Sequence, residues 1–327
     1  VGFYIDKNLT LDGKGYTISS STVQRILHIN NSGTDFINVT LKNLTIAASG
    51  DSQRALETRS AYINLTLDHV TLDTSSSTNG NSQGLTIGGT TVGAVLDEGQ
   101  LPVVVNIING SRVLANRVGY AIIVFNPVEL TVTDSTINQE GIGWAAFYLK
   151  GPNSSEGASG SEIVVENSTI YSTGQTSGAT NDFAAIVFED GNISLSISES
   201  TIVVTGAPNE QQTGQALILF SYRYGDPTNI DVALRDNEIT FNSAYRPLVS
   251  DNEENTNSVV FAGGTINVPV EEKYLDPDYA LTYNEVDGTY SIANATRVAS
   301  VGDYTFATLQ DAIDEAAEGD TVKLLAN

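Results

Sequence analysis

A short phrase recurs along the chain, in which polar residues are followed by Thr or a similar residue and then by an aliphatic one. Copies occur at Lys42–Ile46, Asp68–Leu72, Gly110–Val113, Asp134–Ile137, Asn167–Ile170, Glu199–Ile202, Asp236–Ile239 and Gly263–Ile266. Upstream of the phrase lies a run such as Leu130-Thr131-Val132, in which apolar and polar residues alternate. Alternation with a period of two is typical of a β-strand with one buried face. The pattern therefore predicts repeated short strands.

A second, more apolar strand precedes the alternating run. It is clearest at Gly119–Phe125, Gly143–Leu149, Asp182–Phe188 and Gly214–Phe220. Three short strands per repeat, joined by Gly, Asn and Asp turns, would stack like on like about 4.8 Å apart and form parallel sheets. A base coil of roughly two dozen residues with variable insertions favours this solenoid over a propeller, whose repeats are ~40–50 residues long. The predicted fold is all-β, a right-handed parallel β-helix with three sheets.

One segment near the C-terminal end has the helical period instead. Its apolar residues recur at i, i+3, i+4, i+7 and i+8. They are Leu309, Ala312, Ile313, Ala316 and Ala317. Thr308 is the expected N-cap with Asp311 at N3, and Gly319 is the expected C′ residue. The pattern predicts a short amphipathic helix followed by a strand over residues 320–325.

Residues 304–325 resemble the entry of pectin-lyase-like β-helices, where a short amphipathic helix precedes the first strand of the solenoid. They are also similar to a recurrent module of large bacterial surface proteins, in which the next coil reads much like residues 5–18. The resemblance implies a parallel β-helix over residues 1–298, and a cap helix and first strand over residues 299–327 that start a following tandem module. We expect the helix to pack on the C-terminal coils near Ile266–Val270 and Tyr279–Tyr290.

The first strands of the middle coils have an unusual outer face. Alignment of these strands on their first residues places the aliphatic residues of the early coils inside and leaves His28, Glu57 and Arg59 in water. The same alignment turns large apolar residues outward in the middle coils, and these are the candidate ligand- or partner-binding residues. They are Ile123, Phe125, Phe147, Leu149, Ile186, Phe188, Ile218 and Phe220.

Three interpretations of this apolar face remain open. It is covered by a partner or by an insertion at 151–160, 174–181 or 207–214; it is an open ligand patch; or the strand register flips locally. A flip would bury these apolar residues and expose Tyr120, Trp144 and Phe183, an aromatic column suited to sugar rings. Each interpretation makes this sheet the candidate functional surface.

Charge narrows the range of partners. The chain has 15 Lys and Arg against 39 Asp and Glu, a formal net charge of −24. Such a charge repels phosphate backbones and anionic membranes, so neither nucleic-acid binding nor membrane insertion is expected. The absence of cysteine excludes disulfides and thiolate metal sites. With its Ser/Thr/Asn-rich strands and a first residue that reads as mid-strand, the chain is expected to belong to a longer secreted protein of the bacterial cell surface.

Catalytic patterns are weak. Polygalacturonase-like hydrolases carry an Asp-Asp pair and a His-Gly dipeptide, and the sequence contains neither. His28 and His69 stand alone, and the arginines are scattered along the chain without an acidic cluster at their coil position. The acidic pairs are expected in solvated loops, where weak calcium binding is the one cofactor chemistry that they allow. These pairs are Glu189–Asp190, Glu253–Glu254 and Glu271–Glu272.

We therefore expect a non-enzymatic module of a bacterial surface adhesin or stalk. It would bind glycans or host or bacterial surface proteins, or project a binding tip, beside adjacent modules of the same chain. The alternative is a polysaccharide lyase or hydrolase of the pectin-lyase-like kind. That activity requires several carboxylates, or calcium with an Arg or Lys base, around one substrate position.

Overall fold

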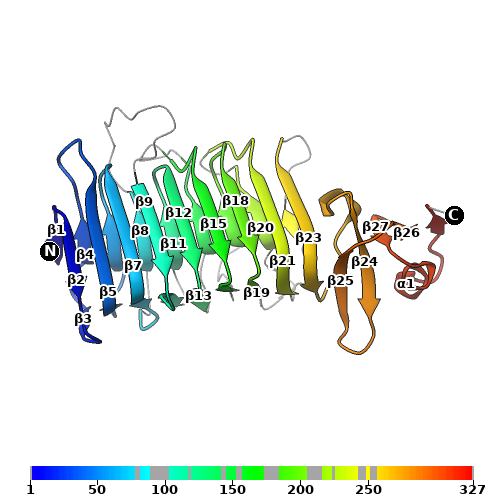
Figure 1. Ribbon diagram of the computed structural model, residues 1–327, viewed down its shortest axis with the longest axis horizontal. Coiled ribbons are helices and arrows are strands. Elements are labelled where there is room, and N and C mark those ends of the chain that lie inside the picture. Colours follow the sequence, from blue (N-terminus) through cyan, green and yellow to red (C-terminus); the bar gives the residue numbers. More distant parts are fainter. Residues whose placement is uncertain are drawn as a thin grey trace.

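The computed structural model describes residues 2–77, 82–88, 103–116, 119–140, 145–151, 157–172, 184–204, 216–222, 225–241, 248–250 and 256–325. Within these residues the chain is nearly all β, with parallel sheets that stack along one axis in a solenoid-like arrangement (Figure 1). One short α-helix lies near the C-terminal end. The predictions of an all-β chain, of parallel sheets and of a C-terminal helix are confirmed.

The smaller sheet has nine strands, and the pairings that join them are parallel. In spatial order they are β1 (Phe3–Ile5), β4 (Arg25–Ile29), β6 (Arg54–Thr58), β8 (Ser82–Ile87), β11 (Gly119–Val124), β14 (Ala145–Leu149), β17 (Ala184–Phe188), β20 (Ala216–Phe220) and β22 (Val249–Ser250). These strands come from the apolar run that precedes each alternating run in the sequence.

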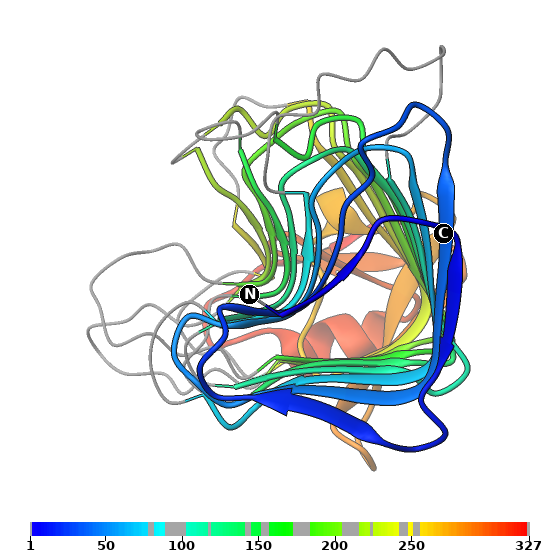
Figure 2. The ribbon, with the colours of Figure 1, turned by 90° about the vertical axis from the view of Figure 1, so that its left-hand side faces the viewer.

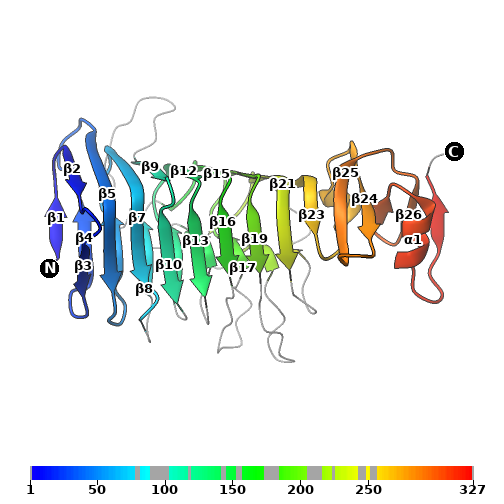
Figure 3. The ribbon, with the colours of Figure 1, turned by 60° about the horizontal axis from the view of Figure 1, so that its bottom comes forward.

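The larger sheet contains two parallel ladders that meet at a corner. The first ladder joins β2 (Leu9–Asp12), β5 (Ile37–Ala48), β7 (Ile63–Thr74), β9 (Val103–Ile108), β12 (Val128–Thr133), β15 (Glu162–Glu166), β18 (Ser194–Ser198), β21 (Asp231–Phe241) and β23 (Ser258–Ile266). The long strands β5, β7, β21 and β23 continue around the corner into the second ladder. The other strands of this second ladder are β3 (Thr17–Ser20), β10 (Arg112–Asn116), β13 (Thr136–Glu140), β16 (Thr169–Ser172) and β19 (Thr201–Val204). Strands β10, β13, β16 and β19 lie side by side in Figure 3.

The recurrent phrase of the sequence forms this corner. Each copy contains a residue with a positive φ, which turns the chain out of the extended conformation, and the last copy contains two. These residues are Asn43, His69, Gly110, Asp134, Asn167, Glu199, Asp236, Gly263 and Gly264. Behind them runs a column of buried polar side chains, in which the backbone N–H of one coil donates to the side chain of the next. Ser135 donates to Ser168 Oγ at 3.1 Å, Ser168 to Ser200 Oγ at 3.0 Å and Ser200 to Asn237 Oδ1 at 2.9 Å.

Alternate residues of the larger sheet fill the interior. In β7, for example, Ile63, Leu65 and Leu67 are buried before the corner, and Val70 and Leu72 are buried after it. Full burial of one such side chain stabilises the fold by about 1.5–3 kcal/mol. Seen along the axis, the coils superimpose around this interior (Figure 2). A continuous apolar core therefore runs the length of the solenoid.

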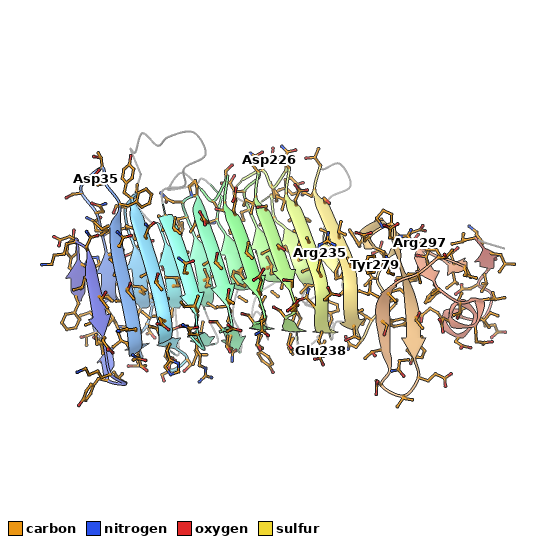
Figure 4. All side chains as sticks on the ribbon, in the orientation of Figure 1. Asp35, Asp226, Arg235, Glu238, Tyr279 and Arg297 are labelled. Atoms are coloured by element: carbon orange, nitrogen blue, oxygen red, sulfur yellow. The ribbon has the colours of Figure 1, made fainter. Side chains whose placement is uncertain are left out.

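The stack of parallel coils ends at β23, and the following residues form smaller elements whose pairings are mainly antiparallel. These are the 3₁₀ turn η1 (Glu272–Tyr274), the hairpin β24 (Tyr279–Asn284) and β25 (Thr289–Asn294), and the strands β26 (Ala299–Val301), β27 (Tyr304–Phe306) and β28 (Val322–Leu324). Arg297 holds the junction, since it donates to the carbonyls of Tyr279 and Asp276 at 3.1 Å and to Glu272 Oε1 at 2.8 Å (Figure 4). The division at residue 298 stays a prediction.

The C-terminal helix α1 (Leu309–Glu315) begins as predicted but is shorter. Thr308 Oγ1 accepts from the N–H of Asp311 at 3.1 Å, which confirms the N-cap. The predicted C′ residue is wrong, because the helix ends at Glu315 and Gly319 lies in a later turn with a φ of 99°. The helix rests on β26, β27 and β28, and the Tyr290 hydroxyl bonds to Glu315. Ala312 is buried, whereas Leu309 and Ile313 are 40% and 48% exposed, so only part of the predicted apolar stripe is covered.

Candidate functional site

The outer face of the nine-stranded sheet changes in character along the solenoid. On β4 and β6 it carries charged residues, and on β8 the polar Gln83 and Thr86 continue the same rows. From β11 onward the face becomes apolar. Its buried members form a cluster apart from the main core, namely Tyr120, Ile123, Ala145, Tyr148, Ala184, Val187, Ala216 and Leu219. The charged end of this face is the candidate functional site.

Three arginines surround one buried carboxylate at this end. Glu57 is 0% exposed and forms ion pairs with Arg25 through Oε2 and with Arg54 through Oε1. The Nε of Arg59 lies 3.9 Å from Glu57 Oε2. The side chains of Arg25 and Arg54 keep 24% and 20% of their surface exposed, so the guanidinium groups border solvent although the carboxylate does not.

The parallel register brings these residues together. Arg25 on β4 pairs with Arg54 on β6, and His28 pairs with Glu57. Three positions after Arg54, Glu57 returns to the same outer face, because Ala55 and Leu56 both join the interior core. The sequence interpretation that the arginines are scattered is therefore wrong for these three residues. The expectation that Glu57 and His28 face water is also wrong, since both are buried.

His28 is the unusual member of the site. It is 7% exposed, and neither of its ring nitrogens has a hydrogen-bond partner among the described residues. Tyr4 on β1 makes an edge-on contact with its ring, with the ring centroids 4.8 Å apart. Burial lowers the pKa of His28, and the nearby charge of Glu57 only partly offsets this effect. The imidazole is therefore neutral at pH 7, with one donor and one acceptor left unpaired.

Positive charge is in excess at this site. Arg25 and Arg54 share a single carboxylate, so these two guanidinium groups exceed it by one charge. Burial is the main effect that lowers the pKa of Arg54; Glu57 opposes this effect, and the charges of Arg25 and Arg59 add to it. An additional anion placed beside Arg54 would thus be stabilised by the local field.

The structure places the predicted site residues on both faces of the sheet. Phe147 pairs with Ile122, so the alignment that set it beside Ile123 is wrong by one residue. Six predicted outward residues consequently face the interior core, namely Phe147, Leu149, Ile186, Phe188, Ile218 and Phe220. Ile123 and Phe125 lie on the outer face as the alignment predicted. Tyr120 shares that face with them, but it is buried, so its predicted exposure in a flipped register is wrong. Trp144 and Phe183 lie outside the described residues.

Strict alternation fails in these strands because two consecutive residues point inward at one place. Examples are Ile26 with Leu27, and Ala185 with Ile186, all of which belong to the main core. The local register flip thus holds for the large apolar residues of β14, β17 and β20 and not for their first residues, because Ala145, Ala184 and Ala216 belong to the outer cluster. Strand β11 has the same orientation as the early strands. The interpretation of this face as an open ligand patch is wrong for the outer cluster, because the residues of that cluster are buried. The proposed covering segments 174–181 and 207–214, and residues 152–156 of the segment 151–160, lie outside the described residues.

The pair Glu189–Asp190 lies at the rim of this face and is buried, which contradicts its expected place in a solvated loop. Glu189 accepts from the Tyr148 hydroxyl and from Lys150 Nζ at 2.6 Å. Asp190 accepts from the N–H of Ser159 at 2.9 Å and of Gly191 at 3.0 Å, and burial raises its pKa. Both carboxylates therefore hold neighbouring segments in place. Glu253–Glu254 lies outside the described residues, and Glu271 and Glu272 bind Lys273 and Arg297.

The acidic groups of the outer face are too far apart to form a glycosidase pair. Glu57 lies on β6 and Glu189 directly follows β17. These two strands are four strand spacings apart, or roughly 19 Å at about 4.8 Å each. Glycoside hydrolases hold their two carboxyl groups about 5–9.5 Å apart. Over the described part of the chain, no group of three or more His, Asp or Glu side chains is arranged to hold a metal ion.

Comparison with known proteins adds no relative: no protein family, no curated protein and no solved structure matches the chain. Among the described helices, none has the length and apolar character needed to cross a membrane.

Proposed function

We propose that the chain is a non-enzymatic, glycan-binding module of a secreted bacterial surface protein of the adhesin type. Its ligand lies on the outer face of the nine-stranded sheet, at the charged end formed by β4 and β6. The observation that carries this proposal is the gathering of Arg25, Arg54 and His28 around Glu57 on that face. Partly exposed guanidinium groups and a buried imidazole without a hydrogen-bond partner are suited to bind a polar ligand rather than to stabilise a core.

We also propose that the coils form a right-handed, three-sheet parallel β-helix of the pectin-lyase-like kind. The parallel ladders on both sides of a repeated corner support this fold. Such solenoids carry ligands on extended surfaces built by successive coils. Adjacent modules of the same chain are the other proposed partners. The exposed apolar residues Phe3 and Tyr16 on the first coil, and Leu324 at the opposite end, are suited to such contacts.

A polysaccharide lyase is the second candidate function. The position of Arg25 and Arg54 on a face that borders solvent favours it, because a lyase requires a basic residue beside the sugar ring. The ion pairs of Glu57 argue against a lyase, because its carboxylate already binds Arg25 and Arg54 and is not available as a separate acid. The hydrolase form is disfavoured by the separation of Glu57 from Glu189.

The test is a glycan panel combined with a turnover assay. The purified chain is screened for binding to neutral and acidic oligosaccharides and to extracellular-matrix proteins, and each glycan that binds is then assayed for hydrolysis and for elimination. The proposal predicts saturable binding of at least one glycan without turnover. Multiple turnovers of any glycan would replace it with an enzymatic function, and binding to matrix proteins alone would replace the glycan with a protein partner.

A further inference from the structure

The geometry points to an acidic sugar as the ligand of this site: we propose that Arg25 and Arg54 bind one carboxylate- or sulfate-bearing sugar, with His28 and Tyr4 beside it. This inference rests on the proposed glycan binding and specifies its chemistry. Uronic acids and sulfated sugars are the two classes of sugar that carry such an anionic group.

The donors lie in one row along the solenoid. Arg25, Arg54 and Gln83 occupy paired positions on β4, β6 and β8, so their backbones are about 4.8 Å apart. A guanidinium group presents a planar fork of N–H donors that matches a carboxylate or sulfate. Arg25 uses Nε for Glu57 and Nη1 for Gln24 Oε1, at 2.8 Å, whereas Arg54 uses Nη1 for Glu57. Each guanidinium group has five N–H donors, so the remaining donors of both can bind a second anion.

His28 supplies an independent indication of a ligand. A buried polar group without a hydrogen bond is costly, so native structures rarely leave both nitrogens of an imidazole unpaired. Its ring lies on the strand position paired with Glu57, between β1 and β6. A hydroxyl or anionic oxygen of a sugar seated beside Arg25 would provide the missing partner.

Tyr4 offers the apolar part of the site. Its ring is 49% exposed and contacts the edge of His28. The hydroxyl accepts from Asn30 Nδ2 at 2.7 Å, which fixes the ring at this position. Aromatic rings with one exposed face pack well against the apolar face of a sugar. An anionic group on the arginines and a sugar ring on Tyr4 can thus be bound by one small ligand.

The overall charge of the chain selects the kind of acidic glycan. At −24 the molecule repels a dense polyanion as a whole, whereas the excess positive charge at Arg25 and Arg54 acts over a short range. A terminal or isolated acidic sugar on an otherwise neutral glycan avoids the overall repulsion and still binds the local positive charge. A long polyuronate or a heavily sulfated chain does not.

The experiment compares trisaccharides that differ only in charge. Calorimetric titrations use a neutral β-1,4-glucan trisaccharide, the same trisaccharide with a terminal glucuronate, and the same trisaccharide with a terminal 6-sulfate. A polyglutamate peptide and a long polyglucuronate complete the series. The wild-type chain should bind at least one of the two acidic trisaccharides at least tenfold more tightly than the neutral one, and which of them binds more tightly identifies the anionic group.

Variants locate the binding on the chain. Arg54→Gln and Arg54→Lys should each weaken binding of the acidic trisaccharide at least tenfold, since Lys keeps the charge but not the planar fork. Arg112→Gln is the matched control, because Arg112 is exposed on β10 in the other sheet, and it should bind as the wild type does. If Arg54→Gln does not fold, Arg54→Lys keeps the test valid.

Several results would overturn the inference. Equal binding of neutral and acidic trisaccharides would refute the acidic ligand while leaving glycan binding intact. Undiminished binding by a folded Arg54→Lys variant would refute the site, and tighter binding of polyglutamate or polyglucuronate would replace the isolated acidic sugar with a polyanionic partner. Absence of binding to all three trisaccharides would refute the inference, and the glycan panel then decides whether the proposed function fails as well.

Discussion

Arg25 and Arg54 occupy paired positions on neighbouring parallel strands, and both form ion pairs with the carboxylate of Glu57. Like charges at paired positions destabilise a sheet. The pair is tolerated here because Glu57, which is fully buried, lies between the two guanidinium groups. The stability of the first coils therefore depends on this single carboxylate.

Substitution Glu57→Gln should lower the free energy of unfolding by about 2–3 kcal/mol. Removing one partner of a buried ion pair costs about 3–5 kcal/mol, and the partial exposure of both arginines reduces this cost. Urea denaturation followed by circular dichroism measures the change. Glu129→Gln on the outer face of β12 is the control and should stay within about 0.5 kcal/mol of the wild type. Equal effects of the two substitutions would show that Glu57 does not organise the arginines.

His28 should make the chain less stable below pH 6.5. Its pKa in the fold is lowered, so the unfolded state binds more protons as the pH falls below the ordinary value of about 6.5. Stability is thus full above that pH and is lost as the pH falls toward the folded-state pKa. The charged and titratable groups that face His28 are Arg25 on its own strand, Tyr4 on β1, Glu57 on β6, and Arg59, which directly follows β6. The melting temperature should fall between pH 7 and pH 5.5.

The variant His28→Phe should remove most of this pH dependence and keep or raise the melting temperature at pH 7. The substitution eliminates two unpaired nitrogens and retains an aromatic partner for Tyr4. His69→Asn is the matched control, because His69 has a φ of 56° that Asn tolerates well. An unchanged pH profile in His28→Phe, or its loss in His69→Asn, would contradict the account of His28.

The buried serine column should contribute measurably to stability. Ser168 Oγ accepts from the N–H of Ser135 and donates to the carbonyl of Glu166, so Ser168→Ala leaves a buried N–H without an acceptor. The expected loss is about 1–3 kcal/mol in chemical denaturation. Ser194→Ala removes an exposed hydroxyl from the next coil and should change stability by less than about 0.5 kcal/mol. A loss no larger than that of the control would mean that the column is not needed.

Phe147 tests the register of the middle strands. It belongs to the interior core, so Phe147→Ala should destabilise the chain by about 3–5 kcal/mol. Tyr16→Ala removes an aromatic ring that is 77% exposed and should have little effect in the same denaturation experiment. If the two variants were equally stable, Phe147 would lie outside the core, as strict alternation implies.

The local parts of the fold could be predicted from the sequence. The repeated phrase marks the corners because Asn, Asp and Gly favour a positive φ, and Thr308 marks the helix start because its hydroxyl satisfies a free N–H. The orientation of β14, β17 and β20 could not be predicted by alternation. A strand in which Ala146 and Phe147 both point inward shifts every later residue by one place.

The charged site was missed for a different reason. Arg25 and Arg54 are far apart in sequence, and only the register of β4 with β6 brings them together. One signal was present in the sequence, since Arg25, Arg54 and Gln83 each stand two residues before a leucine of their strand. Read as a column, those three residues would have indicated a row of donors. The burial of His28 and Glu57 has no comparable signal, because burial of an outer face depends on the whole fold.

The structure of the chain bound to an acidic trisaccharide tests the glycan-binding face most directly. Crystals are grown with the trisaccharide at a concentration near its solution Kd, so that weak binding at other positions stays unoccupied. We predict the anionic group within hydrogen-bonding distance of the guanidinium groups of Arg25 and Arg54, on the outer face of the nine-stranded sheet. A trisaccharide bound to the larger sheet, or at either end of the solenoid, would contradict the account.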